Sequence, residues 1–129
     1  MDLDRSPAEI ARTAGNEIRT LNHRTLQRSA FTYPSEIQDT VTGLAAVLLG
    51  LPQSLDQIYH GIDGVNAAQR LYTYDNSNVE DVLDGAKAEL LEAVGHIREA
   101  SQALQQVVNR LAYVGAIVPA DEEEATESV

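Results

Sequence analysis

A heptad repeat over residues 79–114 constrains the fold of this chain more than any other feature. Every seventh position from Leu83 to Leu111 is leucine or isoleucine, and three residues after each comes alanine or valine, from Ala86 to Val114. Apolar residues that lie alternately three and four positions apart are typical of a long helix with a narrow seam facing another helix. At 1.5 Å per residue this helix is about 50 Å long. It therefore needs a partner of similar length.

The segment 35–72 provides that partner. Its apolar positions keep the same alternation, at Ile37, Val41, Leu44, Leu48, Leu51, Leu55, Ile58, Ile62 and Val65. The alternation continues in register through Pro52, although proline costs about 3 kcal/mol in a helix interior. Two interpretations are open, one kinked helix or two helices that share an axis and break at 50–52. The unbroken register favours the kinked helix.

The remaining segments complete an all-α prediction. Ser6, Pro7 and Glu9 form a helix start, with a serine cap and proline at the first helical position, and this helix runs to about Arg28. Residues 73–78 are rich in turn-forming side chains. The sequence predicts a long antiparallel helical hairpin, about 35–72 (kinked at Pro52) and 79–114. We expect the shorter helix, about 7–28, to pack on one end of it.

Composition limits the class of protein. The chain has 129 residues, no cysteine and a net charge of −11. The sequence predicts one helical domain over 1–118 and a disordered acidic tail over 119–129. The longest apolar run is far shorter than the roughly 20 residues of a membrane span, so we expect a cytoplasmic protein without membrane contact. Eight arginines stand beside one lysine, a bias that indicates a bacterial genome of high GC content.

Charge also bears on nucleic acids. Arg5, Arg12 and Arg19 recur every seven residues in the N-terminal helix, which leaves open a nucleic-acid-binding regulator. The net charge opposes phosphate binding over the rest of the chain. A protein partner is therefore favoured over nucleic acid.

Two sets of acid and histidine are the only pattern that suggests chemistry. Asp56, His60 and Asp63 repeat the spacing of Glu92, His96 and Glu99. Paired carboxylates and imidazoles on two helices occur in di-iron bundles, so a metal protein or enzyme using both sets is the alternative hypothesis. The spacing differs from that of those bundles, and acid–histidine pairs four residues apart on a solvated face explain it. Phosphate-binding loops, nucleophile elbows and zinc-protease helices are missing from the sequence. The prediction is a protein that is not an enzyme and needs no cofactor.

Surplus apolar side chains near the turn suggest an interaction surface. Tyr59, Val82 and Leu91 fall off the predicted seams, where the shorter helix cannot reach them. We expect them to bind a partner, in a homodimer or a heteromeric helical complex. Gly43, Gly50 and Gly64 share one heptad position. Either these glycines allow another helix to approach closely, or they are surface glycines that the helix tolerates.

The string Leu51-Pro52-Gln53-Ser54-Leu55-Asp56-Gln57 within a helical hairpin resembles short all-helical proteins of actinobacterial genomes, often found near mobile elements. That resemblance implies the architecture and no activity. The hairpin also resembles the small helical substrates of type VII secretion. It departs from them because their turn carries Trp-x-Gly, whereas this chain has no tryptophan and turns through Tyr74-Asp75-Asn76. The sequence predicts an adaptor, assembly factor or small regulator that acts through helix–helix packing.

Overall fold

The computed structural model describes residues 1–117, and every element of regular secondary structure in it is a helix. In chain order these are α1 (Pro7–Thr25), the short 3₁₀ helix η1 (Arg28–Ala30), α2 (Pro34–Ala68) and α3 (Val79–Leu111). No strand occurs in the described part of the chain. The predicted all-α fold is confirmed, whereas the packing of the short helix on one end of the hairpin stays a prediction. The tail predicted over 119–129 lies outside the described residues.

Two units make up the chain. One contains Met1–Ile37 and, of the described residues, 115–117, and the other is Gln38–Val114, which holds most of α2 and all of α3. None of the helices in residues 1–117 is long and apolar enough to cross a bilayer. The hairpin unit contains every candidate partner-binding residue and both acid–histidine sets.

Side-chain caps begin α1 and α3. The Ser6 hydroxyl accepts a hydrogen bond from the Glu9 amide at 3.2 Å, and Pro7 occupies the first helical position of α1. At the start of α3 the Asn78 side chain accepts from the Asp81 amide at 3.1 Å. Each cap satisfies one amide that the first helical turn leaves without a partner.

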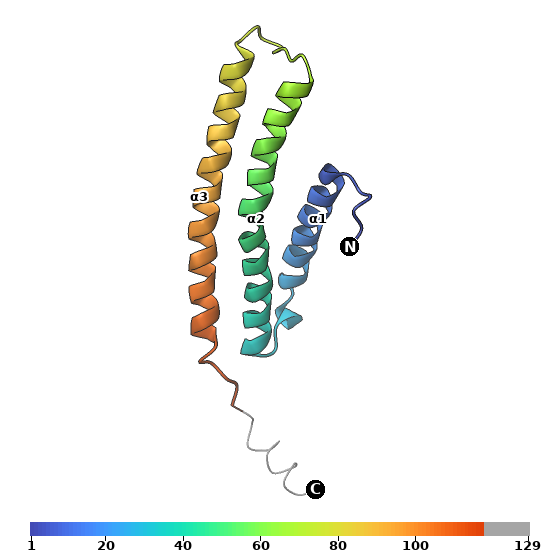
Figure 1. Cartoon of the computed structure of the whole chain (residues 1–129). Coiled ribbons are helices and arrows are strands. Elements are labelled where there is room, and N and C mark those ends of the chain that lie inside the picture. Colours follow the sequence, from blue (N-terminus) through green and yellow to red (C-terminus); the bar gives the residue numbers. More distant parts are fainter. Residues whose placement is uncertain (118–129) are drawn as a thin grey trace, which may run out of the picture. The chain divides into compact units, whose positions relative to one another are not determined.

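The long helices α2 and α3 pack against each other as an antiparallel pair joined by the turn 69–78 (Figure 1). α2 passes through Pro52 without interruption, so the continuous helix is confirmed over the two-helix alternative. A bend at Pro52 stays a prediction. The turn holds Asn76 in the left-handed region, at φ 62°, a conformation that asparagine tolerates better than most residues.

All three predicted helices end earlier than the sequence indicated. α1 stops at Thr25 instead of Arg28, since Gln27 has an extended backbone. α2 stops at Ala68 instead of residue 72. In the turn that follows, the Thr73 hydroxyl donates to the Ser77 carbonyl at 2.7 Å, a side-chain hydrogen bond of the kind that competes with helical pairing.

The third correction is in α3, which stops at Leu111 instead of Val114. The amides of Tyr113 and Val114, just beyond its end, donate to the carbonyls of Arg110 and Leu111, three residues back. These tight bonds satisfy carbonyls at the helix end and close the helix before Gly115.

Three cross-helix contacts define how the hairpin is paired. The Gln38 side chain donates to the Val108 carbonyl at 3.2 Å, the Lys87 ammonium lies 5.3 Å from the centre of the Tyr59 ring, and Asn66 donates to Glu80 at 3.0 Å. Because the helices are antiparallel, a step of seven residues forward along α2 reaches the level of a step of seven residues back along α3. The same step places Pro52 level with Val94, at the middle of the hairpin.

This pairing widens each predicted seam. The predicted column Val41, Leu48, Leu55 and Ile62 of α2 is half-buried, as is the column Leu83, Leu90, Ile97, Leu104 and Leu111 of α3. Of the second predicted column, Leu44, Leu51, Ala86 and Ala93 are half-buried as well. Side chains one residue further along are also half-buried or, at Val94, buried: Gln38, Ala45, Pro52, Tyr59 and Asn66 in α2, and Lys87, Val94, Ser101 and Val108 in α3. Ile58 and Val65, predicted to face the seam, are 51% and 53% exposed.

Directional contacts account for the difference. The apolar stripe of α2 is three columns wide, and apolar burial by itself does not depend on direction. Rotating α2 by one column therefore changes the buried apolar area little. Hydrogen bonds and contacts between a cation and an aromatic ring do depend on direction, and Gln38, Tyr59 and Asn66 each make one with α3.

The hairpin has almost no core. Val94, at 9% exposure, is the only buried residue among the 117 that the structure describes. Large apolar side chains on both long helices remain exposed, among them Leu49 at 76%. Two helices can cover each other along one stripe only, so a broad apolar surface is left open along α2 and α3.

Candidate functional site

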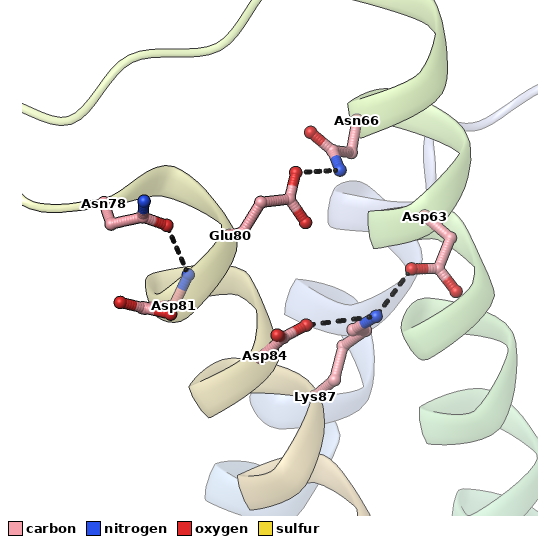
Figure 2. A network of polar contacts seen from close by, with 7 residues as sticks. All are labelled: Asp63, Asn66, Asn78, Glu80, Asp81, Asp84 and Lys87. Carbon is pink, nitrogen blue, oxygen red and sulfur yellow. Dashed lines mark hydrogen bonds and ion pairs between the residues drawn. The ribbon is translucent and has the colours of Figure 1, made fainter.

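A polar cluster closes the turn end of the hairpin (Figure 2). The Lys87 ammonium lies 2.8 Å from an Asp63 oxygen and 3.6 Å from an Asp84 oxygen. Nearby, Asn66 bonds to Glu80, and the Asn78 cap bonds to Asp81. The lysine ammonium lies over the Tyr59 ring, and the side chain is only 19% exposed. These contacts join α2 to α3 and fix their register near the turn.

The hydrogen bond from Lys87 to Asp63 raises the pKa of the lysine above its ordinary value of 10.5. A raised pKa in the folded state adds stability that is complete below the ordinary value and is lost as the pH rises through the raised one. We expect the stability difference between the wild type and Lys87→Gln to stay constant up to pH 10.5 and to shrink above it. Urea unfolding at a series of alkaline pH values measures this. A difference that does not change with pH would contradict the role of the ammonium.

A groove runs along one side of the hairpin, across its middle. Its volume is about 650 Å³, and all of its lining comes from α2 and α3. Most lining side chains are apolar, with a polar minority: Leu48, Leu49, Pro52, Gln53, Leu55, Asp56, Tyr59, Leu90, Leu91, Val94, Arg98, Ser101 and Gln102. Val94 and Pro52 lie level at its centre. We call this surface the central groove.

The structure brings together two of the three predicted partner-binding residues. Tyr59 and Leu91 both line the central groove, Tyr59 half-buried and Leu91 55% exposed. Val82 is 49% exposed but is not among the lining residues. It precedes Leu91 by nine residues, which at about 100° per residue places it on the opposite side of α3. The three residues therefore do not share one surface.

The acid–histidine sets form pairs within each helix. His60 lies 3.7 Å from Asp56, and His96 lies 3.6 Å from Glu92, with all four side chains more than 60% exposed. Asp63 points to Lys87 instead of His60 (Figure 2). Within residues 1–117 no three histidine or acidic side chains gather closely enough to hold a metal ion. The geometry matches solvated pairs, and the metal or enzyme alternative stays a hypothesis.

The three glycines in register face open space. A Cβ atom added at Gly43, Gly50 or Gly64 would meet no atom within 4 Å. In the described chain no helix approaches them, so a close approach would require another molecule.

Sequence reasoning missed Lys87 and Arg98. A signal for Lys87 was present, because Asp63 and Lys87 are equally far along the chain from Asp75 and a hairpin that turns near there brings them close together. Arg98 carried no such signal, since its position beside the groove depends on the rotation of α3. Its guanidinium makes no ion pair or hydrogen bond within residues 1–117.

No known protein family, curated protein or solved structure matches this chain. The resemblance to short actinobacterial helical proteins stays a prediction.

Proposed function

We propose that this chain is a non-enzymatic interaction protein, an adaptor, assembly factor or small regulator, that packs its hairpin against another helical surface. One observation carries the proposal. Of the 117 described residues only Val94 is buried, although α2 and α3 carry apolar side chains along most of their length. A hairpin of this kind obtains most of its hydrophobic stabilisation only when something covers it.

The central groove is the surface that suits such packing. Leu49 and Leu91 stand on it largely exposed, above the half-buried side chains of Leu48, Leu55 and Leu90. Contiguous exposed apolar patches on soluble proteins mark interaction sites. The groove follows the helix direction, so a helix fits it by side-chain interdigitation.

Photo-cross-linking in cells that express the protein natively tests this function. We expect p-benzoylphenylalanine in place of Leu91 to form a covalent adduct with a polypeptide, whether a second copy or another protein. The same group in place of Glu99, an exposed residue of α3 outside the groove, serves as the matched control and is expected to form none.

The identity of the adduct does not decide this test. Adducts of equal yield at the two positions would show contact without a specific surface. The lack of any adduct at Leu91 would remove the groove as an interaction site and with it the proposed function.

A further inference from the structure

The charges on the central groove point to what covers it. From the level of Pro52 and Val94, Leu91 and Asp56 lie three and four residues toward the turn. Leu49 and Arg98 lie three and four residues away from it. Each half of the groove therefore carries one exposed leucine and one charged residue, and the two charges are opposite.

Asp56 and Arg98 do not pair within one chain. They lie about eight residues apart along the helix axis, roughly 12 Å. Asp56 contacts His60 on its own exposed helix face, and Arg98 has no polar partner in the described residues. The arginine is therefore free to pair with another molecule that seats an acid on its half of the groove.

We propose that the groove binds a second copy of this chain, so that the two grooves face each other. The twofold axis that relates the copies lies in the plane of the groove, perpendicular to the helices, at the level of Pro52 and Val94. This rests on the proposed function and names its partner. The rotation exchanges the two halves of the groove. α2 then packs on the partner's α2 and α3 on its α3, and the half of the groove that carries Asp56 and Leu91 lies over the half that carries Arg98 and Leu49. Asp56 and the Arg98 of the other copy are level and approach each other across the midline between the helices.

The charges also exclude the other simple arrangement. An axis parallel to the helices would place Asp56 beside the partner's Asp56 and Arg98 beside the partner's Arg98. Like charges close together in a partly buried interface oppose association. The perpendicular axis alone makes the groove complementary to itself.

The dimer contact extends beyond the groove along the face of the hairpin. The groove lining spans about 12 residues of each helix, roughly 18 Å, and at a width of roughly 20 Å it provides about 700 Å² over the two copies. Specific interfaces bury about 1,200–2,000 Å², so the flanking turns of α2 and α3 must take part. Two copies would form a four-helix bundle whose interior includes the central groove.

Charge reversal tests this arrangement. Light scattering gives the mass of the wild type, Asp56→Arg and Arg98→Asp, each as the full chain, with circular dichroism to verify the helices. We expect the wild type at twice the 14.0 kDa chain mass. Each single variant should dissociate with an affinity loss of at least tenfold, because two contacts per dimer become repulsive.

An equimolar mixture of the two single variants gives the sharpest result. In the mixture each introduced charge faces the opposite charge on the other chain, so we expect a heterodimer close to wild-type affinity. The double variant Asp56→Arg/Arg98→Asp should also dimerise. Glu92→Arg is the matched control, because it makes the same charge change and removes the same kind of histidine pair outside the groove. It should leave the dimer intact.

Three outcomes would overturn the proposal. They are a monomeric wild type at high concentration, single variants that associate as well as Glu92→Arg, and a mixture that stays monomeric. A monomeric wild type that still cross-links to another protein through Leu91 would overturn the second copy and leave the proposed function standing.

Discussion

Replacing Val94 with aspartate is expected to unfold most of the hairpin at 25 °C. Val94 is the only buried side chain in the described chain, and it lies level with Pro52 at the middle of the pairing between α2 and α3. A carboxylate there would lose much of its hydration, and Arg98, four residues further along α3, is exposed and offsets only a small part of that loss. The cost is about 3 kcal/mol, which is a large part of the stability of an ordinary small domain.

The loss is measured as the helical circular dichroism signal and the urea midpoint. Ala88→Asp is the matched control, since Ala88 is exposed on α3 and is not on the groove. It should cost only about 0.5 kcal/mol through helix propensity. If the two variants unfold at the same urea concentration, the pairing that places Val94 inward is wrong.

Replacing Ile97 with alanine is expected to have the next largest effect, a loss of about 2 kcal/mol. Ile97 belongs to the leucine and isoleucine column of α3 that faces α2, and it is half-buried. Truncation of a buried isoleucine costs about 2–5 kcal/mol, and partial exposure places Ile97 at the lower end of that range.

Glu99→Ala provides the comparison, because Glu99 is exposed two residues further along the same helix. Its removal should change the free energy of unfolding by less than about 0.5 kcal/mol. Equal losses for Ile97→Ala and Glu99→Ala in chemical denaturation would contradict the assignment of the facing column.

The polar column between the helices gives the hairpin its specificity. A seam of leucine and alanine alone would allow α2 and α3 to slide by a heptad or to rotate by one column at small cost. Lys87 with Asp63, Asn66 with Glu80, and Gln38 with the Val108 carbonyl each form in one register only. The first two pairs are at least partly exposed, so they add little stability and act mainly by selecting the alignment.

Pro52 illustrates how tertiary structure reuses a residue that opposes helix formation. Local propensity alone would break the helix there. The structure keeps α2 continuous and places Pro52 at the groove, level with Val94. Packing on the opposite helix therefore outweighs the missing backbone hydrogen bond at this position.

The sequence by itself determined the number, order and approximate limits of the helices. The reason is that capping residues, turn residues and the period of apolar positions act locally, as at Ser6, Asn78 and the Leu83 to Leu111 column. Only the tertiary structure decided which side of each helix faces the other. A stripe three columns wide in α2 permits two rotations of similar apolar burial, and the choice depends on contacts between residues far apart in the chain. That choice turned Tyr59 inward, left Ile58 and Val65 exposed, and placed Asp56 and Arg98 on one groove.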